Sequence, residues 1–146
     1  MSLTFTEATS IKELKKLHDY TIDAFSDTPD FSWTLDDLKH EMKDGWHIYS
    51  VTNEEEDVVA AVFVKVEGDT LYTKNTGLKI HHQGMGYSHQ IKEFFEQFAR
   101  KKKLKNLVHY CRIDNFRMYS LNESHGYSKT GNKIGDGQVV EWIKKI

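Results

Sequence analysis

The sequence predicts a mixed α/β (α+β) fold with about seven strands, in a single domain that covers residues 1–146. Short β-rich runs and helical patterns follow each other in the order β-α-α-β-β-β-α-β-α-β-β. The strand pattern from Val58 to Val66 is apolar on both faces at first, which is typical of a central strand. The strongest helical pattern, at i, i+3, i+4, i+7 and i+8, consists of Ile91, Phe94, Phe95, Phe98 and Ala99.

The first half of the chain is predicted to begin with a strand at Leu3 to Ala8, followed by two helices. Ser10 and Glu13 match a capping box at the start of the first helix. Thr34 starts the second helix, in which Asp37 occupies the favourable third position. The apolar face of the first helix consists of Ile11, Leu14, Leu17 and Phe25.

Turn residues and helix ends delimit the remaining elements. Glu67-Gly68-Asp69 predicts a hairpin turn. Lys101 to Lys103 close one helix, and Gly126 ends the next as a C-terminal cap. The other predicted elements are strands at Trp46–Thr52, Thr70–Ile80, Asn106–Cys111, around Tyr127–Ile134 and Gln138–Ile143, and a short helix at Asp114–His125.

Composition and charge restrict the class of protein. Hydrophobic residues make up 38% and charged residues 29%, which is typical of a soluble folded chain. The net charge of −2 argues against nucleic acid as a main partner. Cys111 is the single cysteine, so we expect a reducing compartment, and we take it to be the cytoplasm. The sequence has neither a membrane-length apolar run nor a signal-peptide pattern, so we expect no membrane partner.

Two glycines, Gly84 and Gly86, stand between a predicted strand and a predicted helix. The free N–H groups of a first helical turn, together with the helix dipole, favour anions such as phosphate. With Ser88, the glycines place a small residue at every second position, so the loop could wrap a pyrophosphate. From this local spacing, a tight strand-to-helix turn without a ligand is as good an interpretation as an anion-binding loop. The third glycine of a dinucleotide-binding loop is missing.

Two motifs resemble one known family. Gln83-Gly84-Met85-Gly86-Tyr87-Ser88 resembles the Q/R-x-x-G-x-G/A motif of the GNAT superfamily of acyl-CoA N-acyltransferases, with Ser88 where glycine or alanine is usual. Asn115 to Tyr127 is similar to the second signature, in which Asn opens a helix that ends in Gly followed by Phe or Tyr. Thr76-Gly77-Leu78 looks like the T-G-V of one branch, and the element order matches the family across the chain.

The resemblance implies a mixed central sheet with a splay between its fourth and fifth strands and helices on both faces. It also implies acetyl-CoA as the cosubstrate and direct transfer of the acetyl group to an amine of a small molecule or protein. A backbone N–H near Leu78 would polarise the thioester carbonyl. The residues implied to bind acetyl-CoA are Leu78, Lys79, Ile80, Gln83, Gly84, Met85, Gly86, Tyr87, Ser88, Asn115 and Asn122.

The chain departs from the family at both proton-transfer positions. Many members have a tyrosine, as general acid, four residues before the glycine of the second signature; this position is Asn122. We predict Tyr119, about one helical turn earlier, as the acid, with core packing as the alternative. Many members have a glutamate in the fourth strand that acts as the general base. The predicted fourth strand of this chain contains no glutamate. We predict His109 as the base, because imidazole has a pKa of about 6.5, with a structural strand histidine as the alternative.

Other candidate residues lie outside the two motifs. Phe31 and Trp33 are predicted to line the acceptor pocket, although the amine acceptor is unidentified and a homodimer is left open. His89 and Lys92 are expected to meet the phosphates of the nucleotide or to face solvent. Neither His81, His82 and His89 nor the pair His109 and Cys111 has the spacing of a zinc site, so we expect no metal. The run Lys101–Lys105 is expected to be a solvated helix end.

The two departures keep a second function open. The missing glutamate and the displaced tyrosine are compatible with a non-catalytic acyl-CoA-binding or sensing module. Release of free thiol from acetyl-CoA in the presence of amines would separate the two functions.

Overall fold

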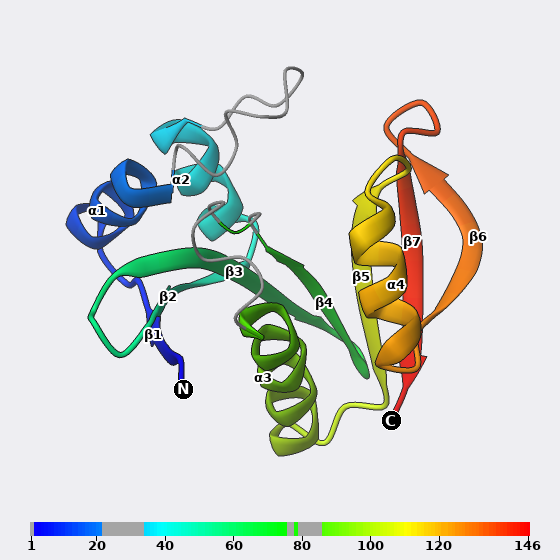
Figure 1. The fold of residues 1–146 in the computed structure, drawn as a ribbon. Helices are drawn as coiled ribbons and strands as arrows, with labels where there is room; N and C mark the ends of the chain where they lie inside the picture. The colour runs from blue at the N-terminus through cyan, green and yellow to red at the C-terminus, as the bar shows by residue number, and fades with distance from the viewer. Residues whose placement is uncertain (1, 22–33, 76–77, 79–85) are drawn as a thin grey trace. The chain divides into compact units, whose positions relative to one another are not determined.

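The structure, a computed structural model, describes residues 2–21, 34–75, 78 and 86–146 (Figure 1). Its helices are α1 (Ile11–Thr21), α2 (Leu35–Lys43), α3 (Tyr87–Lys101) and α4 (Phe116–Ser124). Its strands are β1 (Thr4–Glu7), β2 (His47–Thr52), β3 (Val58–Glu67), β4 (Thr70–Asn75), β5 (Asn106–Arg112), β6 (Ser128–Ile134) and β7 (Val139–Lys145). None of these helices combines the length and the apolar character needed to cross a membrane.

The predicted order of elements is confirmed. The fourth strand differs in length: β4 ends at Asn75, and Leu78, three residues further on, is not in a strand. Residues 79–80, the predicted end of that strand, lie outside the described residues. Residues 70–73 of the strand are paired with β5, from Thr70↔Asn106 to Thr73↔His109.

The seven strands form a mixed sheet in the order β1-β2-β3-β4-β5-β7-β6. β4 and β5 are parallel, with a register that runs from Thr70↔Asn106 to Thr73↔His109. Beyond this point, β5 continues to Arg112, and its residues pair with β7. The end of the β4–β5 register confirms the predicted splay between the fourth and fifth strands, and it makes Thr73 and His109 the last pair before the strands part.

The described residues fall into two compact units. The first unit contains Val58–Phe63 of β3, and the second contains Val64–Glu67 of the same strand. The first unit also holds β1, β2, α1 and α2, whereas the second holds most of β4 and α3, and all of β5, α4, β6 and β7. The expectation of a single domain remains a prediction.

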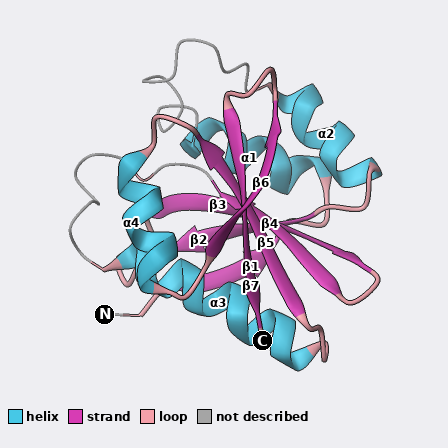
Figure 2. Cartoon of the chain, turned by 90° about the vertical axis from the view of Figure 1, so that its right-hand side faces the viewer, coloured by secondary structure: helices cyan, strands magenta, loops and turns pink. Residues whose placement is uncertain are grey.

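The first unit has an apolar core formed by α1, α2 and its strands. Figure 2 shows the two helices next to each other. Leu14, Leu17 and Leu38 from the helices pack with Ile48 and Phe63 from the strands. Helix α2 begins with a capping box, in which the Thr34 side chain accepts from the Asp37 N–H at 3.1 Å and the Thr34 N–H donates to the Asp37 carboxylate at 3.0 Å. This cap confirms the predicted helix start.

In the second unit, α3 and α4 cover the same face of the strands (Figure 1). The rings of Phe95 on α3 and His109 on β5 are 6.1 Å apart between centroids. The rings of Tyr119 on α4 and Trp142 on β7 are 5.1 Å apart. Because His109 and Trp142 are directly paired across antiparallel strands, both side chains point to one face. This face carries the candidate site.

Candidate active site

Helix α3 begins directly after the second glycine of the loop. Gly86 is exposed and has a φ of +80°, in the left-handed region that favours glycine. Tyr87, the first helical residue, is buried, and Ser88 in the first turn is half-buried. The first turn carries no acidic side chain, so nothing there repels an anion from its free N–H groups. The structure thus supplies the helix start that an anion site requires.

His109 lies at the point where β4 and β5 part, and its protonation state follows from its partner. Thr73 Oγ1 lies 2.8 Å from the carbonyl oxygen of Val108 and 3.0 Å from His109 Nδ1. A hydroxyl has one proton and a carbonyl can only accept, so Thr73 donates to Val108. His109 Nδ1 must then donate to Thr73 Oγ1. The neutral imidazole therefore carries its proton on Nδ1, which leaves the lone pair on Nε2 as the proton acceptor.

The environment of His109 disfavours its charged form. The residue is 1% exposed, and burial lowers its pKa well below 6.5, with the positive charge of Lys92 lowering it further. The expectation that His109 keeps an ordinary pKa therefore needs correction: the imidazole is neutral at neutral pH and is a weaker base than a solvated histidine.

Lys92 is placed differently from the sequence-based expectation. Its side chain is 1% exposed and so does not face solvent, and Nζ has no hydrogen-bond partner within the described residues. Nζ lies 4.6 Å from the centroid of the Tyr127 ring, a cation–π distance. A signal existed in the sequence, because Lys92, Phe95 and Ala99 follow the i, i+3, i+7 spacing of the buried face of α3.

Burial also changes the acid–base behaviour of Lys92. Burial lowers its pKa from 10.5 to about 7. At a pH between these two values, Lys92 is protonated in the unfolded chain and neutral in the folded chain. The free energy of unfolding therefore decreases as the pH falls from about 10.5 toward about 7. A lysine of this kind is a functional candidate, since it exchanges a proton near neutral pH.

Tyr119, the predicted general acid, lies on α4 at the edge of the same face. Its ring contacts Trp142, and Lys129 Nζ lies 4.5 Å from its centroid. The pKa of Tyr119 is raised, first because neighbouring atoms remove water from its hydroxyl and then because of the charges of Cys111 and Asp114. The phenol therefore keeps its proton at neutral pH, as a general acid must. Its aromatic contacts are also those of the packing alternative, so its role stays a prediction.

The two asparagines of the second motif have different environments. Asn115 is the N-cap of α4, and its side chain accepts a hydrogen bond from the Met118 N–H at 3.2 Å. Asn122 is fully buried, and neither its amide oxygen nor its amide nitrogen has a hydrogen-bond partner within the described residues. A buried amide without partners is costly to the free protein. A bound group that both donates and accepts, such as an amide of the pantetheine arm, would fit it.

Replacing this amide should separate stability from binding. We expect Asn122→Leu, which has a similar volume, to raise the free energy of unfolding by about 1–3 kcal/mol, because a buried polar group without partners is removed. We expect the same change to weaken CoA binding about tenfold. Urea unfolding and isothermal titration calorimetry measure the two effects. A variant that binds CoA as tightly as the parent would remove Asn122 from the binding residues.

The remaining predicted binding residues fall mostly outside the described part of the chain. Leu78 is described and half-buried, outside any strand. The predicted residues that lie outside the described part of the chain are Lys79, Ile80, Gln83, Gly84 and Met85 for the cosubstrate and Phe31 and Trp33 for the acceptor. Their roles stay predictions.

His89, the other residue expected at the phosphates or in solvent, is exposed and is hydrogen-bonded to a second histidine. His89 Nδ1 lies 2.8 Å from Nε2 of His125, so one ring donates a proton to the other and at least one of them is neutral. Within the described ranges, no group of three or more His, Cys, Asp or Glu side chains is arranged to hold a metal ion. The histidine pair links the first turn of α3 to the C-cap of α4.

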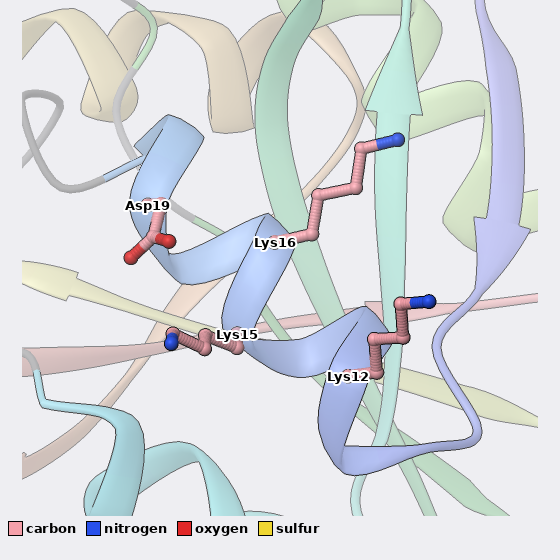
Figure 3. A pocket seen from close by; sticks show the side chains of 4 residues that line it. All are labelled: Lys12, Lys15, Lys16 and Asp19. Carbon is pink, nitrogen blue, oxygen red and sulfur yellow. The ribbon is translucent and has the colours of Figure 1, made fainter.

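A shallow hollow lies elsewhere, on helix α1 (Figure 3). All of its lining residues belong to this one helix: Lys12, Lys15, Lys16 and Asp19. The lysine side chains extend in different directions, so their ammonium groups do not converge on one point. We assign no ligand to it.

Comparison with known proteins identifies the fold. The structure is similar to the PaiA N-acetyltransferase from Thermoplasma acidophilum in complex with coenzyme A (TM-score 0.79, 14% identity, 100% of both chains covered). It is similar to the ribosomal-protein-S18-alanine N-acetyltransferase from Escherichia coli (TM-score 0.77, 16% identity, 99% of this chain and 94% of the other). It is also similar to the spermidine N-acetyltransferase from Vibrio cholerae in complex with CoA and spermine (TM-score 0.75, 13% identity, 98% of this chain and 95% of the other).

The chain therefore has the GNAT N-acetyltransferase fold, as its two motifs predicted. No protein-family model and no curated protein sequence matches the chain. At these identities, the likeness extends to the fold alone.

Proposed function

We propose that the protein is a GNAT-superfamily N-acetyltransferase that transfers the acetyl group of acetyl-CoA directly to an amine of a small molecule or protein. The observation that carries the proposal is the combination, on this fold, of the motif Gln83–Ser88 at the start of α3 with His109 at the last β4–β5 pair. The reducing compartment inferred from the single cysteine, with a cytoplasmic location, belongs to the same proposal.

The cosubstrate would be bound by backbone more than by side chains. The first N–H groups of α3 would receive the pyrophosphate, since Gly86 leaves open space where a side chain would stand. The unpartnered amide of Asn122 would hydrogen-bond the pantetheine arm. Asn115, whose oxygen caps α4, retains its amide N–H groups for the same purpose.

The proposed reaction needs two proton transfers. The amine nitrogen attacks the thioester carbon, the new C–N bond forms and the C–S bond breaks. His109 Nε2 accepts the proton from the nitrogen after attack, when positive charge makes the N–H strongly acidic, so a weak base is sufficient. Tyr119 donates its hydroxyl proton to the leaving thiolate. Before the next turnover His109 must lose one proton and Tyr119 must regain one, so the reaction releases no net proton.

A second candidate function, a non-catalytic acyl-CoA-binding or sensing module, is favoured by one observation. Asn122 occupies the position at which many GNAT members have a tyrosine acid, and an amide does not protonate a thiolate. In this case, the chain would bind CoA with no turnover.

Thiol release separates the two functions. We expect the protein to release free CoA thiol from acetyl-CoA when a panel of primary amines is present, and far less without amine. A panel of polyamines, amino acids and peptides with free N-termini covers the main amine classes. CoA binding by calorimetry, with no thiol release for any amine, would favour the sensing module.

A further inference from the structure

Four side chains form a row across the strands of the second unit, on the face that carries the candidate site. Thr73 of β4 is paired with His109 of β5. His109 is in turn paired with Trp142 of β7, and Trp142 with Lys129 of β6. Directly paired residues point to the same face of a sheet. The row therefore brings Lys129, from the last strand in the sheet order, to the face on which His109 lies.

Tyr119 of α4 packs on the Lys129 end of this row. Its ring makes a T-shaped contact with Trp142, with 5.1 Å between the centroids. Lys129 Nζ lies 4.5 Å from the centroid of the Tyr119 ring and 5.6 Å from that of Trp142. The ring of Phe116, one helical turn before Tyr119, is 5.8 Å away and also T-shaped. Two aromatic side chains and one ammonium thus hold the Tyr119 ring.

The other titratable groups around Tyr119 favour its protonated form. Removal of water from the hydroxyl raises its pKa first, and Cys111 and Asp114 raise it further. The pKa of Cys111 is itself raised by burial, and Asp114 accepts a hydrogen bond of 3.3 Å from Arg112. Within the described ranges, Lys129 is the cation that lies at a cation–π distance from this ring. Its charge acts in the opposite direction, toward the phenolate.

We propose that Lys129 is a positioning residue for the general acid Tyr119. Its ammonium holds the ring against Trp142, and its charge stabilises the phenolate that forms when Tyr119 gives its proton to the leaving thiolate. The negative charge of a phenolate is spread partly over the ring, which is the part of Tyr119 that Lys129 contacts. This inference deepens the proposed function and rests on it. The proton still passes from the Tyr119 oxygen to the thiolate sulfur, and Lys129 keeps its own protons.

The alternative is that Lys129 only packs. The apolar stem of a lysine covers aromatic surface with or without its charge. The two roles differ in one respect, because only the positioning role depends on the positive charge. Lys129→Met keeps a stem of similar length and removes the charge, whereas Lys129→Arg keeps a cation that also stacks on aromatic rings.

The direct test is a ¹³C NMR titration of the tyrosine Cζ carbons in the folded protein, which needs no acceptor. The chain contains seven tyrosines, so the Tyr119 signal is assigned as the one missing from Tyr119→Phe. We expect the titration midpoint of Tyr119 in Lys129→Met to lie about half a pH unit or more above that in Lys129→Arg. The parent should lie between the two, since lysine itself loses its charge in the range where the phenol titrates.

Lys133→Met is the matched control. Lys133 lies on the same strand and is paired with Val140, two residues before Trp142 on β7, so it shares the face of Lys129. The substitution removes an ammonium from the same strand and the same face, at a different position along the sheet. Its Tyr119 midpoint should stay close to that of the parent.

The kinetic test is a double-mutant cycle on kcat with one identified acceptor. We expect Lys129→Met to lower kcat about two- to fivefold, the equivalent of an exposed cation–π contact, with CoA affinity unchanged. Lys129→Arg should restore most of the rate. In the Tyr119→Phe background, Lys129→Met should have no further effect on kcat, because the hydroxyl through which it acts is absent. A lysine that only packs would lower kcat by the same factor in both backgrounds.

The inference and the proposed function fail in different ways. If Lys129→Met and Lys129→Arg share one Tyr119 midpoint, the positioning role is contradicted whatever the enzyme does. If the midpoints differ and Lys129→Met lowers kcat equally in both backgrounds, Lys129 does not act through Tyr119 and the inference is again contradicted. If the midpoints differ but no amine yields thiol release, the charge contact is supported and the failure lies with the acetyltransferase function.

Discussion

The Tyr119→Phe enzyme should turn over about 10²–10⁴-fold more slowly than the parent while still binding CoA. The substitution removes only the hydroxyl and keeps the ring, whose contact with Trp142 spans 5.1 Å between centroids. We therefore expect the unfolding midpoint to stay close to that of the parent. The loss of rate would report the proton that the phenol gives to the leaving thiolate.

A matched control is available in the first unit. Tyr49 is a half-buried tyrosine of β2 that donates a hydrogen bond of 3.4 Å to Glu7. Tyr49→Phe removes the same atom from a different part of the chain, and its rate should stay close to that of the parent. A Tyr119→Phe rate within a factor of about three of this control would exclude Tyr119 as the acid and favour its packing role.

Gly86→Val should weaken CoA binding tenfold or more, which corresponds to about 1.4 kcal/mol. In the free protein, a Cβ at Gly86 meets no atom within 4 Å, so the effect on binding would come from the ligand and from the loop backbone. The φ of +80° makes any side chain strained at this position, so part of the loss would come from the backbone of residue 86 and not from the ligand.

Gly137 provides a control for this strain. It has the same φ of +80° and the same open surroundings, in the turn between β6 and β7. Gly137→Val therefore carries a comparable backbone cost at a position that the proposal does not assign to CoA. Calorimetry on both folded variants measures the difference. Equal CoA affinities for the two variants would contradict the phosphate-loop assignment.

Local sequence signals predicted the elements because their causes are local. Gly126 ends α4 with a φ of +84°, and the bond from the Tyr127 N–H to the Asn122 carbonyl closes the helix end at 2.9 Å. The glycine after a helical pattern is sufficient to predict this. The Thr34 cap of α2 depends in the same way on residues within three positions of one another.

The candidate site was less predictable, because its properties depend on packing between elements distant in the sequence. Lys92 lies on the apolar stripe of α3, but a rule that counts lysine as polar places it in solvent. Its burial depends on β5 and on Tyr127, which are distant along the chain. The pKa of His109 is lowered for the same reason, since both burial and the charge of Lys92 arise only in the folded unit.

The motif residues show a similar division. The sequence placed Asn115 and Asn122 in one signature, but it could not distinguish a cap from a buried amide. This distinction depends on which side of α4 faces the strands. The prediction that Phe31 and Trp33 line the acceptor pocket rests on the family resemblance, and both residues lie outside the described part of the chain.

The central claim is that this chain moves an acetyl group from acetyl-CoA to an amine. The most direct measurement follows the group itself, using acetyl-CoA labelled with ¹³C in the acetyl carbons and mass spectrometry of the amine panel. We predict that at least one amine gains one labelled acetyl group on nitrogen for each CoA thiol released. Label found only in free acetate, or no labelled amine despite tight CoA binding, would contradict the claim.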